Sequence, residues 1–343
     1  MKRYGDLKKI WCTYETLLQA FNEVKKRKTY KDCFLIYENN LAVNLSNLLT
    51  RLDDGSYKPR APYQFTIYEP KERIIEAPHL EDRIVQHALL IAARGLIEER
   101  FTTNSYACRV GYGTHKANDD LKRALIKYKN SGYYLKLDIK KYFYSINHRQ
   151  ILRLLKQIIK CKPTIELFTK FFTVGQNVGL ALGNVTSQIL ANLMLNPIDH
   201  FIKRVLKIKN FFRYMDDFIL LHNCKDTLYK CWERIEKEVK KLCLSLNKKS
   251  KVGKISEGID FVGFKTWYNR RIIRKSSLFR IKRKLKKDVN ISRIASFLSH
   301  SKRTNSLPYV INKIMEVVPQ QKDFIKSWII NNKGEQYNAL FQN

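Results

Sequence analysis

The chain has few acidic residues and no long apolar run. Only 31 Asp and Glu accompany 65 Lys and Arg, which gives a formal net charge of +34. No apolar stretch approaches the roughly 20 residues that span a bilayer. The basic N-terminus, MKRYGDLKKIWCTYETLLQAF, lacks a continuous apolar core and a small-residue cleavage site. We therefore expect neither a membrane span nor a secretory signal.

The cysteines do not form a recognisable framework. They are odd in number, scattered, and none belongs to a CxxC pair. This pattern predicts free thiols in a reducing cytoplasm, with neither a zinc site nor a disulfide framework. The seven are Cys12, Cys33, Cys108, Cys161, Cys224, Cys231 and Cys243.

The excess of positive charge indicates a polyanionic partner. A chain this basic repels itself unless a polyanion neutralises it. Nucleic acid is the first candidate, an anionic membrane surface the second and an acidic protein the third. Because 44% of the residues are hydrophobic, the chain is not compositionally disordered. Its 343 residues are enough for two or three subdomains.

Hydrophobic periodicity predicts alternating helices and strands. Strands are predicted on both sides of Pro70, at 133–138, on both sides of a turn at Asp216–Asp217, and in GIDFVGFK. Helices are predicted at 1–60 (with loops), after Pro78, over most of 148–174, from Ser187 after the loop GLALGNVTSQ, and at 225–246.

A change in composition near residue 270 predicts a further domain. The stretch RRIIRKSSLFRIKRKLKK has ten basic residues in eighteen positions. Leu278, Ile281 and Leu285 keep helical spacing, so we expect one basic amphipathic helix over 270–287. Its charges indicate contacts with nucleic-acid phosphates, although a charge run is more often a solvated face.

The stretch FFRYMDDFILL places two adjacent acids between apolar runs. An Asp-Asp pair alone is usually a solvated turn. Here a third acid, Asp138, ends a distant strand, and an antiparallel sheet can bring that strand end beside the 216–217 turn. Three converging carboxylates need cations to stay ionised, and hard divalent ions such as Mg²⁺ fit oxygen ligands. Two ions about 3.5–4 Å apart would support nucleotidyl transfer.

At this point an ordered series of motifs resembles the reverse transcriptases, over roughly residues 60–310. The segments are PKERIIEAPHLEDRIVQHAL, SYACRVGYGTHKA, YYLKLDIKKYFYSINH, LGNVTSQILANLML, FRYMDDFILL, LSLNKKSKV and GIDFVGF. The resemblance implies an α+β right-hand polymerase fold, in which an antiparallel sheet flanked by helices joins a helical thumb. We place the N-terminal region and fingers at 1–132, the palm at 133–270 with finger insertions around 150–185, and the basic thumb at 271–343.

The resemblance also assigns roles to individual positions. Asp138, Asp216 and Asp217 match the catalytic metal-binding acids, with Ile139 as a further metal ligand, and the implied cofactor is two Mg²⁺ ions, with Mn²⁺ as the alternative. Phe143 matches the bulky gate that selects dNTPs, and Lys71 and Arg73 match the cations that hold the incoming phosphates. The full dNTP-binding set is Lys71, Arg73, Ile139, Lys140, Lys141, Tyr142, Phe143, Leu182 and Gln188.

Two further sets follow from the same resemblance. The primer grip comprises Phe261, Val262, Gly263 and Phe264. Contacts with nucleic acid are assigned to Arg109, Lys249, Arg280, Lys282, Arg283 and Lys284. Plain alternatives remain open: Phe143 as a core residue, and Lys71 and Arg73 as a solvated hairpin face.

Two motifs resemble one subgroup, the reverse transcriptases of diversity-generating retroelements. The sequence has LGNVTSQ where most bacterial relatives carry QGxxxSP, and RVGYGTH matches the subgroup's RxGxGTH; FLSHSKRTNSLPY also resembles that group's thumb. Leu182 offers no hydrogen bond where a Gln would offer several. We therefore expect error-prone copying of template adenines, unless Leu182 is only a packing residue.

The resemblance implies an RNA-directed DNA polymerase whose partners are template RNA, the RNA/cDNA duplex, dNTPs and a small basic accessory variability protein. We expect no membrane partner, a cytoplasmic location in a prokaryotic or phage-encoded system, and no maturase, zinc-knuckle, endonuclease or RNase H segment. The alternatives are a retron or abortive-infection type reverse transcriptase and a non-catalytic RNA-binding relative. A membrane-surface protein ranks last, because the charge is spread through the motif-bearing segments.

Overall fold

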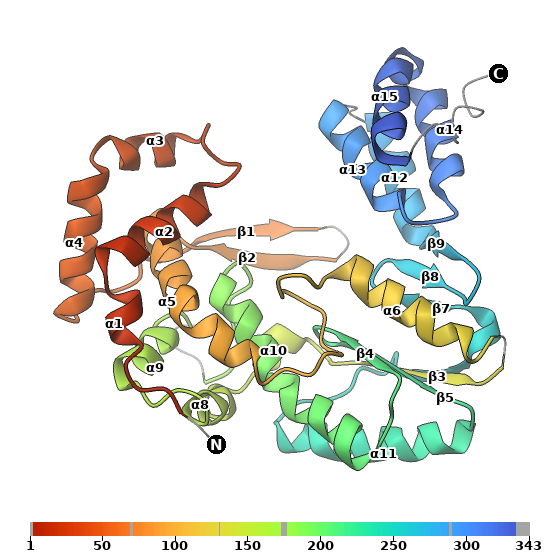
Figure 1. Cartoon of the computed structure of the whole chain (residues 1–343), viewed down its shortest axis with the longest axis horizontal. Helices are drawn as coiled ribbons and strands as arrows, with labels where there is room; N and C mark the ends of the chain where they lie inside the picture. Colours follow the sequence, from red (N-terminus) through yellow and green to blue (C-terminus); the bar gives the residue numbers. More distant parts are fainter. Residues whose placement is uncertain (1–2, 69–70, 130, 173–176, 288–289, 334–343) are drawn as a thin grey trace. The chain divides into compact units, whose positions relative to one another are not determined.

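A computed structural model describes residues 3–68, 71–129, 131–172, 177–287 and 290–333. Contacts divide the chain into two compact units, each built from three segments (Figure 1). The first unit comprises Met1–Val110, Leu137–Lys209 and Cys231–Ser250, and the second comprises Gly111–Lys136, Asn210–Lys230 and Lys251–Asn343. Both contain helices and strands, so the predicted mixed α+β class is confirmed. The division into fingers, palm and thumb remains a prediction.

The N-terminal part of the first unit is helical, as predicted. Helices α2 and α5 make its main helix–helix contact, and α2 is capped by Thr13, whose side chain accepts a hydrogen bond from the Thr16 amide. The long α5 also packs against α10 and buries Ile84, Leu89 and Ala93. The helices are α1 (Lys8–Trp11), α2 (Tyr14–Lys25), α3 (Asp32–Asn39), α4 (Leu41–Asp53) and α5 (Leu80–Glu98).

A two-stranded hairpin follows α4 in the chain. Strands β1 (Tyr63–Ile67) and β2 (Arg73–Ala77) pair antiparallel, with Tyr63 opposite Ala77 and Ile67 opposite Arg73. This confirms the two predicted strands, whereas Pro70 lies outside the described residues.

Among the remaining helices of the first unit, α10 (Val185–His200) is buried along nearly its whole length and contacts α5 and the helix at His148–Lys156. It begins two residues before the predicted start at Ser187 and continues into a π-helical turn, η1 (Phe201–Val205). The others are α7 (Tyr142–Ser145), α8 (His148–Lys156) and α9 (Lys162–Thr169).

Helix α11 (Lys225–Lys241) ends earlier than the predicted residue 246. Cys243 adopts a left-handed φ of +59°, and its amide donates to the Lys240 carbonyl at 2.9 Å. The chain turns there because Leu246 forms a β-bridge with Ile139. A contact with a distant segment therefore ends the helix.

The second unit is built on a four-stranded sheet with the order β4-β5-β3-β6. Helix α6 (Thr114–Ile126) contacts β4 and also β8 of a second sheet. Alternation in β3 buries Leu135 and Leu137, as predicted. The strands are β3 (Tyr133–Asp138), β4 (Phe211–Tyr214), β5 (Asp217–His222) and β6 (Lys251–Lys254).

A three-stranded sheet and a helical bundle complete the second unit. The short turn η2 (Ile255–Glu257) precedes the sheet, and η3 (Pro319–Gln321) connects the last two helices of the bundle. One apolar core joins Phe264 and Ile273 of the sheet to the buried faces of the helices. The elements are β7 (Ile259–Phe261), β8 (Phe264–Thr266), β9 (Arg271–Ile273), α12 (Lys275–Lys287), α13 (Ile291–Ser301), α14 (Leu307–Val317) and α15 (Lys322–Lys333).

The prediction of one helix over 270–287 is wrong in its first part. Residues 271–273 form β9, and α12 begins at Lys275. Arg271 is only 2% exposed and pairs with Asp119 at 2.9 Å, while Ile273 lies opposite Phe264. Strand pairing and a buried ion pair therefore override the local helical pattern. Within the described ranges, none of the helices has the length and apolarity needed to cross a membrane.

Candidate active site

The two adjacent acids occupy a tight turn of the second unit. Tyr214 lies opposite Asp217, so Met215 and Asp216 form a two-residue connection between β4 and β5. Met215 has a φ of +56°, a left-handed conformation that costs energy in a non-glycine residue. Arg213 is fully buried, and its Nη1 donates to the Met215 carbonyl at 3.0 Å. The buried Arg213 side chain therefore stabilises the strained turn through this hydrogen bond.

A lysine also lies beside the second acid. Lys136 Nζ is 3.4 Å from Asp217 Oδ2 and donates to the Asp260 carbonyl at 2.7 Å. The sequence prediction did not include Lys136. Its signal was nevertheless present, since Lys136 and Asp138 lie two residues apart in β3 and so share one face of the sheet. Lys136 partly neutralises Asp217.

The third acid, Asp138, is held by a loop of the first unit. Asn247 Nδ2 donates to Asp138 Oδ2 at 2.9 Å, and the Asn247 amide donates to the Asp138 carbonyl at 2.7 Å. Ser250 Oγ accepts from the Asp138 amide at 3.4 Å. This loop belongs to the motif LSLNKKSKV, in which only the exposed Lys249 was predicted to have a role, as a contact with nucleic acid.

The segment after Asp138, which is predicted to bind the dNTP, contains both buried and exposed residues. Ile139 is buried, whereas Lys140 and Lys141 are exposed, and Lys141 takes a left-handed φ of +45°. Tyr142 is buried and its hydroxyl donates to the Ala191 carbonyl. Phe143 is half-buried, and its carbonyl accepts from the Leu180 amide at 2.8 Å. Its side chain is therefore neither wholly in the core nor on the surface.

The loop that contains Leu182 is fixed against the β1–β2 hairpin. The Glu76 amide donates to the Leu182 carbonyl at 2.7 Å. Gly183 has a φ of +136°, and a Cβ atom there would lie 2.2 Å from the Glu76 carbonyl oxygen. Only glycine fits this close approach.

A buried glutamine anchors the other end of the same loop. Gln86 is fully buried; its Nε2 donates to Asn184 Oδ1 at 3.0 Å and its Oε1 accepts from the Val185 amide at 3.0 Å. The sequence prediction missed Gln86. A polar residue within the apolar face of the predicted helix was the available signal.

The predicted cations differ in exposure. Lys71, Arg73 and Lys249 are exposed, as is the polar Gln188. Arg109 is instead largely buried: its Nη1 donates to the carbonyls of Thr102 and Ser105, both at 2.9 Å. Arg109 therefore has an internal structural role, and its contact with nucleic acid remains a prediction.

The predicted primer grip is a hairpin turn. Phe261 and Phe264 lie opposite each other and are buried, so Val262 and Gly263 form the turn, with φ of +45° and +90°. Two positive φ angles are typical of tight hairpins. Val262 and Gly263 are partly exposed, and contact of this motif with a primer remains a prediction.

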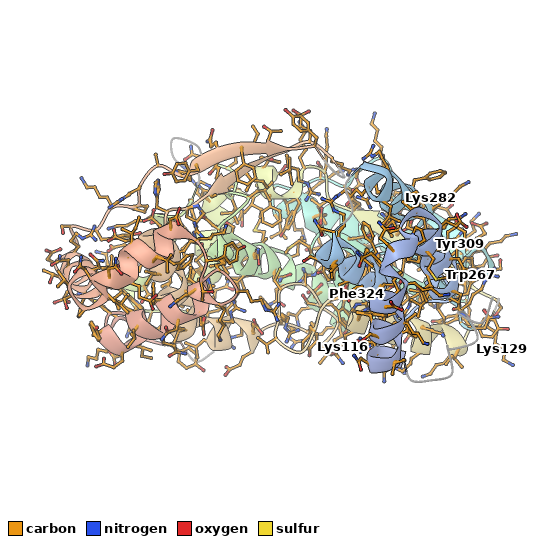
Figure 2. The ribbon with its side chains drawn as sticks, turned by 90° about the horizontal axis from the view of Figure 1, so that it is seen from above. Lys116, Lys129, Trp267, Lys282, Tyr309 and Phe324 are labelled. Atoms are coloured by element: carbon orange, nitrogen blue, oxygen red, sulfur yellow. The ribbon has the colours of Figure 1, made fainter. Side chains whose placement is uncertain are left out.

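The basic helix α12 presents its cations along the C-terminal bundle. Lys282 Nζ lies 5.4 Å from the centroid of the Tyr309 ring, and both are labelled in Figure 2. Arg280 donates to Ser277 Oγ at 3.0 Å, while Arg283 and Lys284 are exposed. The surface combines cations with an aromatic ring, as nucleic-acid binding surfaces do.

The three acids have the donor chemistry of a divalent-ion site. Carboxylate oxygens suit Mg²⁺ or Mn²⁺. Within the part of the chain that the structure describes, no three His, Cys, Asp or Glu side chains are already grouped around a metal position. The donor types fit, and the Lys136 ammonium supplies positive charge to Asp217.

Comparison with protein families identifies the family to which this chain belongs. Residues 66–266 match the family model described as reverse transcriptase (RNA-dependent DNA polymerase). The chain belongs to the reverse transcriptase family. The matched region includes all three acids, the Leu182 loop and the Val262–Gly263 turn, and the enzyme class is RNA-directed DNA polymerase.

Individual relatives of this reverse transcriptase include intron-encoded proteins. It is 28% identical over 292 residues to protein YkfC of Escherichia coli K12, covering 70% of this chain and 74% of YkfC. It is 26% identical over 226 residues to the group II intron-encoded protein LtrA of Lactococcus lactis subsp. cremoris, covering 60% of this chain and 37% of LtrA. The chain thus spans well under two thirds of LtrA.

A solved structure has a similar fold. Apo telomerase from Candida tropicalis superposes with a TM-score of 0.51 at 14% identity, covering 82% of this chain and 63% of that one. At this identity the likeness concerns the fold alone.

Proposed function

We propose that this reverse transcriptase makes cDNA by nucleotidyl transfer at a site formed by Asp138, Asp216 and Asp217. The observation that supports the proposal is the strand order: β3, which ends at Asp138, is the neighbour in one sheet of β5, which begins at Asp217. Two divalent ions, Mg²⁺ in our proposal with Mn²⁺ as the alternative, would activate the primer 3′-hydroxyl and stabilise the pyrophosphate leaving group.

In this proposal, side chains of the protein orient the acids and neutralise the triphosphate. Asn247 fixes the Asp138 carboxylate, and Arg213 fixes the turn that carries Asp216. The exposed Lys71 and Arg73 would hold the triphosphate over the backbone of residues 139–142. Phe143 would exclude the ribose 2′-hydroxyl and so select dNTPs.

Primer extension on an RNA template with Mg²⁺ and dNTPs tests the catalytic proposal. Asp217→Asn keeps the side-chain shape and removes the charge, so we expect extension to fall by at least about a hundredfold. Asp226→Asn, at an exposed position of α11, is the matched control and should extend normally. Unchanged extension by Asp217→Asn would contradict the proposed role of Asp217, and absence of extension by the wild-type protein would favour a catalytically silent RNA-binding relative.

We further propose that the enzyme serves a diversity-generating retroelement and copies template adenines with low fidelity. The motif LGNVTSQ supports this, and the Leu182 main chain is pinned to Glu76, so the side chain is presented from a fixed loop. The partners would be a template RNA, the RNA/cDNA duplex and a small basic accessory protein.

Product sequencing on RNA templates matched at all positions tests the fidelity proposal. Wild-type enzyme should misincorporate more often opposite A than opposite G, C or U. Leu182→Gln restores a hydrogen-bonding side chain and should reduce the errors at A, whereas Leu182→Met keeps an apolar side chain and should not. Equal error rates at all four template bases would contradict the proposal.

The match to LtrA favours a second candidate, a reverse transcriptase of the group II intron kind. The two candidates differ in the same assay, since an enzyme of that kind has no need of errors confined to adenine. Uniform fidelity together with robust cDNA synthesis would support this candidate.

A further inference from the structure

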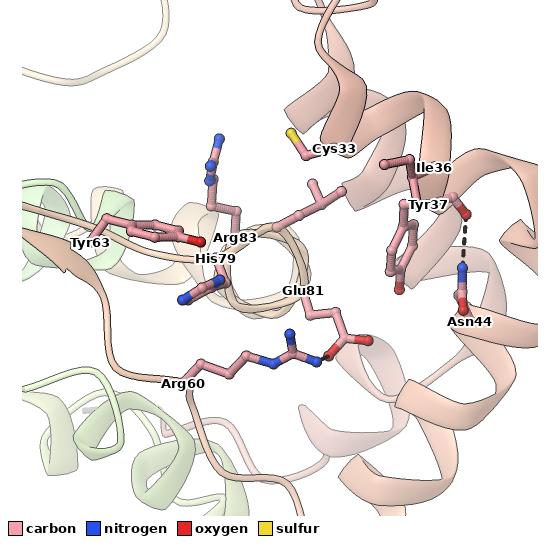
Figure 3. Close-up of a pocket in the computed structure, with 10 residues that line it drawn as sticks. Cys33, Ile36, Tyr37, Asn44, Arg60, Tyr63, His79, Glu81 and Arg83 are labelled. Atoms are coloured by element: carbon pink, nitrogen blue, oxygen red, sulfur yellow. Dashed lines mark hydrogen bonds and ion pairs between the residues drawn. The ribbon is translucent and has the colours of Figure 1, made fainter.

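A cavity of about 480 Å³ lies in the first unit, among α3, β1 and the start of α5. Its volume falls within the range of about 300–1,000 Å³ typical of small-ligand sites. Figure 3 shows Tyr63, His79 and Arg83 facing Cys33 and Ile36 of α3 across the cavity, with Arg60 beneath. Every residue that lines it belongs to the first unit.

The cavity is distinct from the predicted dNTP site. Tyr63 and Ala77 pair at the base of the β1–β2 hairpin, whereas Arg73 pairs with Ile67 at its other end. The cations assigned to the dNTP therefore lie at the opposite end of the hairpin from the cavity.

One wall of the cavity has the form of a stacking platform. Tyr63 is 66% exposed, yet its ring lies 4.5 Å from the ring of His79, centroid to centroid. The His79 Nε2 is 3.0 Å from the Ala61 carbonyl oxygen, which fixes the imidazole. A positioned aromatic ring with an open face is suited to a planar base, and Ile36, which is 69% exposed, offers apolar contact opposite.

The charge at the cavity favours an anion. Glu81, its acidic lining residue, is already engaged by Arg51 at 3.0 Å and Arg60 at 3.6 Å. Arg83 and Lys31 both act on Lys28, whose pKa is lowered first by burial and then by the positive charges of Arg83 and Lys31. An incoming phosphate would relieve this repulsion. The N-terminus of α5 at the cavity acts in the same direction.

We propose that this cavity binds one nucleotide of an RNA strand, with the base stacked on Tyr63 and the phosphate held by Arg60 and Arg83. The proposal rests on the proposed function in one respect, that the polyanion recognised by this chain is RNA. It adds a nucleotide site on the N-terminal helices, outside the residues assigned to catalysis, the incoming dNTP and the primer. Through it the enzyme would hold one unpaired nucleotide of its RNA.

The exposed Cys33 thiol in the cavity provides a local readout. The full chain is alkylated with iodoacetamide at increasing concentrations of a 5′-phosphorylated RNA tetranucleotide, and modification of each cysteine is followed by mass spectrometry. We expect RNA to slow alkylation of Cys33, and the concentration dependence gives the affinity of this site alone. Unprotected Cys33 at RNA concentrations that saturate primer extension would overturn the proposal.

Tyr63→Ala and Tyr68→Ala form a matched pair, since both tyrosines are exposed and only Tyr63 lines the cavity. Loss of stacking should weaken the RNA affinity read at Cys33 by about 5- to 100-fold in Tyr63→Ala. Tyr68→Ala should bind as the wild type does. Equal affinities in both variants would overturn the assignment.

A control probe separates the possible ligands. An acidic octapeptide that protects Cys33 where RNA does not would overturn RNA as the ligand. Primer extension distinguishes the two proposals: Cys33 protection without any cDNA would contradict only the catalytic proposal, and cDNA synthesis without Cys33 protection would contradict only this one.

Discussion

The side-chain amide of Asn247 donates a hydrogen bond to Oδ2 of Asp138 at 2.9 Å, across 109 residues of sequence. The Asn247 main chain adds a second bond to the carbonyl of the same aspartate. One asparagine thus sets both the backbone and the carboxylate of a proposed metal ligand. Partners of this kind are typically needed to orient a ligand correctly.

Asn247→Ala should therefore lower cDNA synthesis more than it lowers stability. The variant leaves Asp138 in place but frees its carboxylate to rotate, and such losses typically cost about 10- to 100-fold in activity or metal affinity. Steady-state primer extension across a Mg²⁺ titration measures the effect. Lys248→Ala, at the exposed neighbouring position, is the control. The same loss of cDNA synthesis in both variants would contradict a specific role of Asn247, because any substitution in the loop would then lower activity.

Alanine substitutions at two glycines should change the free energy of unfolding in opposite directions. Gly183→Ala forces a Cβ to within 2.2 Å of the Glu76 carbonyl oxygen at a φ of +136°, so we expect a loss of roughly 2 kcal/mol or more in the free energy of unfolding. Gly95 lies inside α5 with no atom near its added Cβ, so Gly95→Ala should stabilise by about 0.5–1 kcal/mol. Denaturant unfolding measures both. Stabilisation by Gly183→Ala would show that the Leu182 loop is not held against β2.

Removal of Lys136 should make the protein more dependent on divalent ions. Without the ammonium 3.4 Å from Asp217, the acids repel each other more in EDTA and attract a metal more strongly. For Lys136→Met we expect half-maximal thermal stabilisation at about fivefold lower Mg²⁺, the equivalent of ~1 kcal/mol. Thermal melts across a Mg²⁺ series provide the measurement.

Lys251→Met is the matched control for this experiment. Lys251 lies directly opposite Lys136 in the β3–β6 pair and is exposed, so its removal changes the net charge equally. If both variants shift the Mg²⁺ dependence alike, the effect belongs to overall charge and not to Asp217.

Two histidines should make the second unit less stable in mild acid. The rings of His115 and His300 both lie near the ring of Phe264, at centroid distances of 6.0 and 4.8 Å. Burial lowers the pKa of both; Arg303 further lowers that of His115, and the charge of His115 further lowers that of His300. The unfolded chain, where the histidine pKa is about 6.5, thus binds protons more readily than the folded one.

These lowered pKa values make the protein less stable as the pH falls. The contribution of these histidines to stability is fully present above pH of about 6.5 and is lost as the pH falls toward their folded pKa values. Chemical unfolding between pH 7.5 and 5 should therefore show a decline that becomes shallower in His300→Gln. Leu298→Ala, in the same helix, lowers stability without removing a titratable group and should keep the wild-type slope.

The family and the strands that carry the three acids could be predicted from the sequence. The alternation around Asp138 and the apolar runs around Asp216–Asp217 are local patterns, and β3, β4 and β5 lie where those patterns predicted strands. The ordered motifs identified the reverse transcriptase family before any geometry was known. Local patterns are sufficient here because polar and apolar residues alternate in β3, whereas β4 and β5 are buried on both faces and therefore appear as apolar runs.

The supporting residues could not be predicted in the same way. Asn247, Lys136, Gln86 and Arg213 act through hydrogen bonds or ion pairs, and three of the four reach partners far away in the chain. Arg271 became part of a strand, not a helix, because Asp119 and β8 were available to pair with it. Such choices depend on which distant segments meet.

The sequence by itself therefore determined the candidate groups of this reverse transcriptase: the three acids, the positive charge and the strand patterns that carry them. Only the tertiary structure decided how those groups are held, where α11 ends and α12 begins, and that a cavity with an aromatic wall and a cationic rim exists among the N-terminal helices. The physical reason is that periodicity records burial along one element, whereas a buried polar group takes its place from partners on another.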